Sequence, residues 1–241
     1  VEIEGKSCVD LEVQDGPAYP YYYVFDGSHT AYVRHGDQSE EATSRELNEL
    51  ILQGMNQTFD ALPSSYRVGD VSFTLLAATF KNLKKEDFDL EKDLPSAGLV
   101  TDDGQITNGG LLLCDQGVLK QSRIFCTRWK GNYKGSIEED ALDDKEFQGA
   151  SLITLLQNAE DFVRNNSKNP WSIRGMTREE RSDYPYKAVR EVLVNALIHR
   201  NYQILGSEIH VEVFDDRLEI TSPGGMMNGR RVQDMDIRHI P

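Results

Sequence analysis

The chain has 241 residues, 39% of them hydrophobic, and a formal net charge of -14. This length and composition fit one to three compact domains with a sizeable buried core. No stretch reaches the ~18 to 20 uninterrupted apolar residues of a membrane helix, and the first thirty residues lack a signal-peptide pattern. We therefore expect a cytoplasmic protein without a membrane partner.

The cysteine pattern and the charge distribution exclude two further classes of site. Cys8, Cys114 and Cys126 are far apart, show no CxxC spacing and are odd in number, which argues against a disulfide framework or a zinc site. Residues 1–65 contain 3 Lys or Arg against 12 Asp or Glu. Because proteins that grip phosphate backbones normally present a basic face, we expect the chain by itself to bind nucleic acid poorly.

The first segment alternates polar and apolar residues over 1–40 and is broken by turn-forming Gly and Pro, a pattern typical of short antiparallel strands. Residues 43–56 then predict a helix that Thr43 or Ser44 can cap. We assign residues 1–62 to a first domain that ends before Pro63.

The middle segment, residues 63–170, is expected to form an α+β domain. Its predicted elements are, in chain order, a helix within 71–93, a tight turn at Asp103-Gly104, a strand over 123–129, a solvated acidic loop over 140–146, and a helix over 147–165 with a continuous apolar stripe.

A helix over 185–200 contains the most informative pattern. At about 100° per residue, Glu191, Asn195 and His199 fall on one face, and apolar residues cover the remainder. Burying a carboxylate and an amide is costly unless they meet a partner, and a hydrated magnesium ion with its phosphates is one such partner. The alternative is structural, a polar pair satisfied by neighbouring chain.

A hairpin follows this helix. Residues 207–214 and 217–221 alternate strictly, and Asp215-Asp216 turns the chain between them. The hairpin leads into residues 222–225, Ser-Pro-Gly-Gly, a loop whose backbone can approach a ligand closely. A simple turn after a strand is the alternative for Gly224 and Gly225.

The spacing of Glu191, Asn195 and Ala196, followed by a hairpin and a Gly-rich loop, resembles the N box and first glycine box of the GHKL ATPases, the superfamily of gyrase-type ATPases and histidine kinases. More narrowly, the chain resembles the bacterial ATP-binding transcriptional regulators with a Schlafen-type AlbA-like domain, also labelled divergent AAA or helicase-related proteins. The segments that resemble this family are 32–36, 98–113, 126–131, 184–202 and 214–226.

The resemblance implies a fold and a site. The fold class is α+β: residues 1–62 form the remainder of the AlbA-like domain, and 171–241 form the first half of a GHKL-type α/β two-layer sandwich. Asn195 would ligate magnesium, Glu191 would position the attacking water, and His199 and Arg200 would lie near phosphate. Loop residues Ser222, Gly224 and Gly225 would complete this part of the site.

Two departures from the family pattern bear on the chemistry. Ser222 occupies the position at which the first glycine box normally supplies an adenine-reading aspartate. The second glycine box is expected beyond Pro241, because both ends of the sequence suggest a fragment of a longer protein. A weak magnesium-dependent ATPase is therefore the strongest enzyme activity that the resemblance implies.

Three functions follow from the resemblance. The first is an ATP-binding, DNA-associated transcriptional regulator, with DNA contacted through the full-length protein. The second is a non-catalytic scaffold that serves homo-oligomerisation. The third is a Schlafen-type nucleic-acid-processing protein, although its acidic site would lie largely upstream of Val1. A Walker-type motor is not supported, because residues 131–136 do not provide a P-loop.

Overall fold

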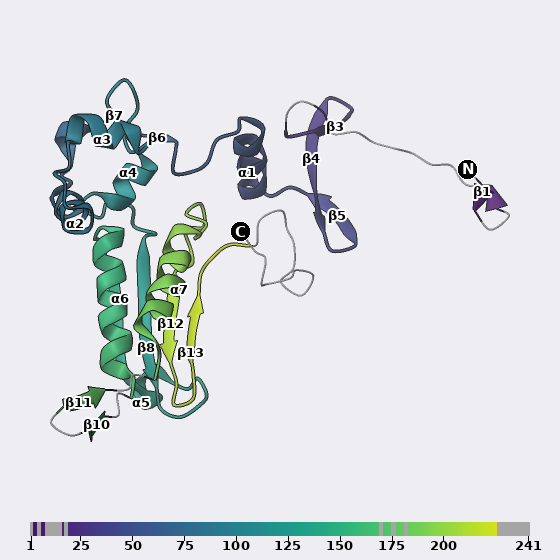
Figure 1. Cartoon of the computed structure of the whole chain (residues 1–241). Coiled ribbons are helices and arrows are strands. Elements are labelled where there is room, and N and C mark those ends of the chain that lie inside the picture. The colour runs from purple at the N-terminus through teal and green to yellow at the C-terminus, as the bar shows by residue number, and fades with distance from the viewer. Residues whose placement is uncertain are drawn as a thin grey trace. The chain divides into compact units, whose positions relative to one another are not determined.

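The structure, a computed structural model, describes residues 2–3, 6–7, 16, 19–168, 171–174, 177–180 and 183–225. The chain divides into two compact units, residues 1–58 and 59–241 (Figure 1). Helices and several separate sheets occur along the chain, so the predicted α+β class is confirmed. No helix among the described residues is long and apolar enough to cross a membrane.

The first unit is a strand meander followed by one helix. β3 (Tyr22–Phe25), β4 (Ser28–His35) and β5 (Gln38–Glu41) form a three-stranded antiparallel sheet. α1 (Ser44–Gly54) begins with a capping box, because the Thr43 side chain accepts from the Glu46 amide while the Glu46 side chain accepts from the Thr43 amide. β1 (Glu2–Ile3) and β2 (Lys6–Ser7) pair with each other. The predicted strands and helix are confirmed here.

The second unit begins with a small helical layer. Its elements are β6 (Pro63–Arg67), the 3-10 helix η1 (Val68–Asp70), α2 (Thr74–Lys84), α3 (Leu90–Ser96), β7 (Gln105–Thr107) and α4 (Asn108–Leu113). The single helix predicted within 71–93 is two helices. Lys85 adopts a left-handed conformation with φ 63° that ends α2, and the Asp89 side chain accepts from two amides to begin α3.

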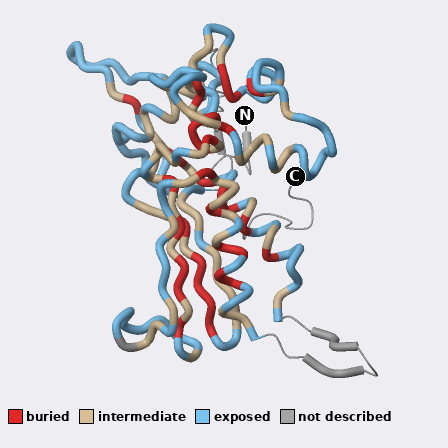
Figure 2. Tube along the Cα trace, turned by 90° about the vertical axis from the view of Figure 1, so that its left-hand side faces the viewer, coloured by how far each residue is buried: buried red, intermediate tan, exposed pale blue. Residues whose placement is uncertain are grey.

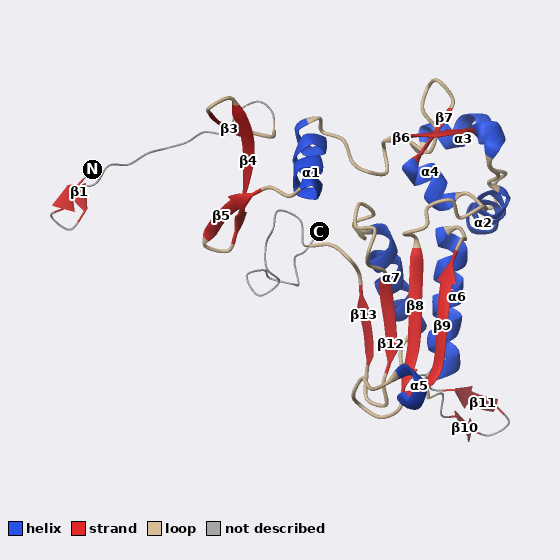
Figure 3. Ribbon diagram, turned by 180° about the vertical axis from the view of Figure 1, so that it is seen from behind, coloured by secondary structure: helices blue, strands red, loops and turns tan. Residues whose placement is uncertain are grey.

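The rest of the second unit is a four-stranded sheet with helices on one face. The strand order is β13 (Leu218–Thr221), β12 (Ile209–Val213), β8 (Arg123–Trp129) and β9 (Ala141–Gln148), with β12 parallel to β8 and the other pairs antiparallel. α6 (Leu152–Asn166) and α7 (Tyr186–Ile198) cover one face (Figure 3). α5 (Ile137–Asp140) precedes β9, and β10 (Trp171–Arg174) pairs with β11 (Thr177–Glu180).

One hydrophobic core joins these two layers. Figure 2 shows buried residues along the central strands and the helix faces that pack on them. The fully or nearly fully buried members include Ile124 and Cys126 of β8, Leu155 of α6, Leu193 of α7 and Val211 of β12. The domain boundary expected at residue 170/171 therefore passes through a single sheet and a single core, because β8 and β9 pair with the later strands.

The acidic run at 140–146 differs from the expected solvated loop. It forms most of β9, an edge strand whose side chains are alternately more and less exposed. Two of its carboxylates accept hydrogen bonds from neighbouring elements. Thr127 Oγ1 of β8 donates to Asp144 at 2.7 Å, and Asn166 Nδ2 of α6 donates to Asp143 at 3.0 Å. Pairing with β8 therefore organises a segment whose composition alone favours a loop.

Candidate functional site

α7 separates an apolar face from a polar face, as its sequence predicted. Val189, Leu193, Ala196 and Leu197 are buried against the sheet and α6. Glu191, Asn195 and His199 are exposed. The side chains of Glu191 and Asn195 form no hydrogen bond with any residue that the structure describes, so nothing in this part of the chain supports the alternative of a pair satisfied by neighbouring chain.

The Gly-rich loop lies at the C-terminal end of this helix. The last carbonyls of a helix lack intrahelical partners. Here the Ser222 hydroxyl donates to the carbonyl oxygen of Ala196 at 2.7 Å, and the Tyr202 hydroxyl donates to that of Leu197 at 2.8 Å. Two side chains from outside α7 thus cap its last turn, and one of them belongs to the Gly-rich loop.

A backbone hydrogen bond fixes the same loop from its other side. The amide of Asn201 donates to the carbonyl oxygen of Pro223 at 2.8 Å. Gly224 has φ 141°, and a Cβ added there would lie 3.4 Å from the Asn201 nitrogen. Gly225 differs, because a Cβ there would meet no atom of the described residues within 4 Å. The conformation therefore calls for glycine at 224, whereas no described residue fills the space beside Gly225.

Arg200 lies away from the position expected for it. The residue is buried, and its guanidinium donates to the carbonyl oxygens of Asn201, Ile204 and Ser207 at 3.1, 3.0 and 2.6 Å. It also stacks over the Tyr202 ring, 4.8 Å from the centroid. Burial lowers the pKa of Arg200. Its placement beside phosphate was expected, but the side chain instead holds the loop between α7 and β12.

An ion pair between a buried carboxylate and a partly exposed arginine fixes α7 on α6, and sequence reasoning did not identify it. Glu160 of α6 is 7% exposed, and its carboxylate accepts from Arg190 at 2.7 Å and from the Tyr186 hydroxyl at 3.3 Å. Desolvation lowers the pKa of Arg190, but the hydrogen bond and charge of Glu160 outweigh it and raise that pKa overall. The available signal was a carboxylate inside the apolar stripe of the helix predicted over 147–165.

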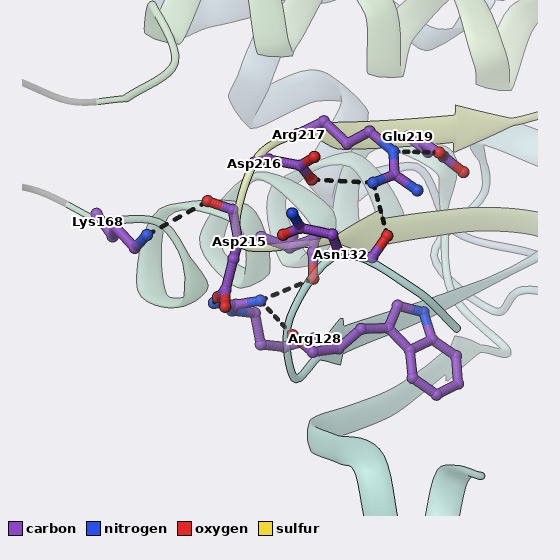
Figure 4. Close-up of polar contacts among 9 residues, drawn as sticks. Arg128, Asn132, Lys168, Asp215, Asp216, Arg217 and Glu219 are labelled. Atoms are coloured by element: carbon purple, nitrogen blue, oxygen red, sulfur yellow. Dashed lines mark hydrogen bonds and ion pairs between the residues drawn. The ribbon is translucent and has the colours of Figure 1, made fainter. Parts of the chain in front are cut away.

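The far end of the hairpin is held by a second set of polar contacts (Figure 4). Arg128 pairs with Asp215, and Lys168 Nζ donates to the Asp215 carbonyl oxygen at 3.3 Å. Arg217 contacts Asp216 and the carbonyl oxygen of Asn132, both at 2.9 Å. This cluster fixes the predicted turn at 215–216, at the opposite end of β13 from the Gly-rich loop.

The groups that the exposed face of α7 offers to a magnesium nucleotide are oxygen ligands. Asn195 and Glu191 expose an amide and a carboxylate on one helix face, which are ligand types that magnesium accepts while it keeps several waters. Among the described residues, no group of three or more His, Cys, Asp or Glu could hold a metal by itself. Cys114 and Cys126 are buried free thiols, and Cys8 lies outside the described residues.

Comparisons with known proteins agree with an ATPase-like C-terminal segment. Residues 206–241 match the family model described as "Putative ATP-dependent DNA helicase recG C-terminal", and the structure describes this segment up to residue 225. No curated protein matches the chain.

A solved structure shares the fold. The crystal structure of the DIP2311 protein from Corynebacterium diphtheriae is similar over 83% of this chain, with a TM-score of 0.57 and 22% identity. The chain spans 40% of that protein's length. The likeness extends beyond the family match and shows a shared fold over most of the chain.

Proposed function

We propose that the chain contributes one wall of an ATP-binding site of the GHKL type, formed by the exposed face of α7 and loop 222–225. The observation that carries this proposal is that Glu191 and Asn195 are exposed and have no hydrogen-bond partner among the described residues, on a helix whose last turn is capped by the Gly-rich loop. The family match over 206–241 supports it, because that match includes the loop.

The roles of the residues follow from their chemistry. Bound magnesium would neutralise phosphate charge, and the Asn195 amide oxygen is the side-chain ligand that this chain offers to it. Glu191, one turn away on the same face, would orient a water, and a weak ATPase activity would follow from that role. His199, exposed at the end of α7, would be a further polar group near phosphate.

Ser222 can replace an adenine-reading carboxylate as a hydrogen-bond acceptor. A hydroxyl has one hydrogen to donate and two lone pairs to accept with. Because its hydrogen is directed to the Ala196 carbonyl, the lone pairs of Ser222 remain for an exocyclic amino group. We therefore propose that Ser222 accepts from adenine, while the open space beside Gly225 allows the backbone to approach the nucleotide.

At the level of the whole protein, we propose an ATP-responsive, DNA-associated transcriptional regulator. The support is the resemblance described above and a family model named after a DNA helicase. Residues 1–65 hold 12 acidic against 3 basic residues, so DNA contacts are expected from other parts of the full-length protein.

A scaffold function is the second candidate, and α7 itself provides the observation that favours it. Val192 and Ile198, which flank the polar face, are 49 and 58% exposed on this helix. Exposed apolar side chains on one helix are suited to packing against another protein segment. A homo-oligomer assembled through α7 would cover the same face that the nucleotide proposal uses, so the two functions compete for it.

Nucleotide-dependent melting of the full-length protein separates the two functions. ATP with magnesium at 100 times its dissociation constant should stabilise the fold by about 2.7 kcal/mol. AMP with magnesium is the matched control, because it lacks the phosphates that magnesium bridges. A melting temperature that is independent of ATP but rises with protein concentration would favour the scaffold.

A further inference from the structure

A pocket lies between the segment that leads into β8 and the loop that joins α7 to β12. It is an open pocket of about 440 Å³. Its lining residues are Val118, Leu119, Lys120, Gln121, Arg123 and Leu205. None of the residues proposed for the nucleotide site lines it, so it is a separate feature of the same unit.

Two cationic side chains line the polar part of this pocket. Lys120 is exposed and forms no ion pair with any residue in the described part of the chain. Arg123 is half-buried, and its Nη2 contacts Glu208 at 3.0 Å while its Nη1 lies 3.9 Å from Glu146. The Nε of Arg123 is buried and has no hydrogen-bond partner in the described structure. The guanidinium therefore keeps unused donor capacity.

A third cation lies in the loop that forms the rim. The acceptors of the buried Arg200 are backbone carbonyls of this loop, and no carboxylate of the described residues forms an ion pair with it. Burial lowers the pKa of Arg200 most strongly, Tyr202 and Glu208 oppose this, and the positive charge of Arg123 lowers it further. Arg123 and Arg200 thus lie near the same carboxylate, Glu208, and Lys120 lines the pocket beside Arg123.

The other part of the pocket is apolar. Val118 and Leu119 line it from one side, and Leu205 lines it from the loop. Leu205 is 70% exposed, so its apolar surface is available for a ligand to cover.

We propose that this pocket binds a small amphipathic anion, a carboxylate or phosphate monoester with an apolar group. The head group contacts Lys120 and the Arg123 guanidinium, and the apolar group covers Leu119 and Leu205. A charged head alone would gain little at such an open site, because solvent screens exposed pairs. The apolar part supplies the additional burial.

The test is a titration of the 241-residue chain followed by amide NMR shifts. Octanoate and octyl phosphate are the anionic probes, and octylammonium is the cationic probe of equal chain length. Both anions, or the one whose head group fits, should shift amides within 118–123 and 203–207, and octylammonium should not. The tighter-binding anion then identifies the head group.

Variants locate the charge and the apolar surface. Lys120→Gln should weaken anion binding about fivefold, and Leu205→Gln should weaken it as well. Lys92→Gln, which changes an exposed lysine of α3 outside the pocket, should leave binding unchanged. Equal shifts with octylammonium, shifts confined to other regions, or unchanged affinity in Lys120→Gln would each overturn the proposal.

Discussion

Ser222 donates its hydroxyl hydrogen to the carbonyl oxygen of Ala196 at 2.7 Å. The contact joins the first residue after β13 to the last turn of α7, two segments separated by the whole hairpin. It does two things at once, because it satisfies a helix-end carbonyl and orients the lone pairs of the hydroxyl away from the helix. The Gly-rich loop and the polar face of α7 are therefore positioned together.

Removing that hydroxyl should loosen the end of α7. Ser222→Ala is expected to lower the free energy of unfolding by about 1 kcal/mol, the usual net value of one neutral hydrogen bond. Ser222→Thr keeps the hydroxyl and should remain close to the wild type. Urea unfolding followed by circular dichroism measures both, and an equal loss in the two variants would mean that the hydroxyl is not the stabilising group.

Tyr202 should give the clearest dependence on pH. Burial raises the pKa of its phenol to about 12, and its hydroxyl caps the Leu197 carbonyl. Tyr202→Phe should cost roughly 1 to 3 kcal/mol at neutral pH, because a buried carbonyl loses its partner.

The sign of the pH effect follows from the raised pKa. The unfolded chain releases the phenol proton near its model value of 10.0, whereas the folded chain keeps it to about 12. As the pH rises from 10 to 12, deprotonation therefore favours the unfolded wild type, and its free energy of unfolding falls. The Phe variant has no phenol at this position and does not lose stability in this way. The difference between the two proteins should shrink across this window, and urea titrations that show a constant difference would contradict the assignment.

The Glu160 and Arg190 pair predicts a non-additive result. Arg190→Met leaves a carboxylate that is 7% exposed with Tyr186 as its remaining partner, and should cost about 2 kcal/mol. The double variant Glu160→Met with Arg190→Met removes both charges and should be more stable than the single variant. A double variant that is less stable than Arg190→Met would show that the Glu160 carboxylate does not need the Arg190 guanidinium.

The two glycines of the loop should differ. Gly224→Ala places a side chain at φ 141° and close to Asn201, and should destabilise the chain by about 1 to 2 kcal/mol. Gly225→Ala adds a methyl group where no described residue lies within 4 Å, so the fold should be unaffected while nucleotide affinity falls. Equal melting temperatures of the two variants would contradict the conformation described for Gly224.

Features set by neighbouring residues were predictable from the sequence. The helix α7, the hairpin and the capped helix α1 follow from periodicity and capping residues within a few positions of one another. The alignment of Glu191, Asn195 and His199 on one exposed face follows from helical geometry alone.

Features set by distant partners were not predictable in the same way. The acidic run at 140–146 is a strand because β8 pairs with it, and Arg200 is buried because loop 201–207 folds around it. Glu160 meets Arg190 thirty positions along the chain. Local patterns do not contain these pairings, so sequence reasoning placed Arg200 at phosphate and left Glu160 unassigned.

Calorimetric titration of ATP with magnesium into the full-length protein and its Asn195→Ala variant tests the central claim most directly. Asn195 is exposed and makes no hydrogen bond to described residues, so truncating it should leave the melting temperature unchanged while abolishing magnesium-dependent ATP binding. A wild type that binds no nucleotide, or a variant that binds ATP as tightly as the wild type, would contradict the assignment of this helix face to a nucleotide site.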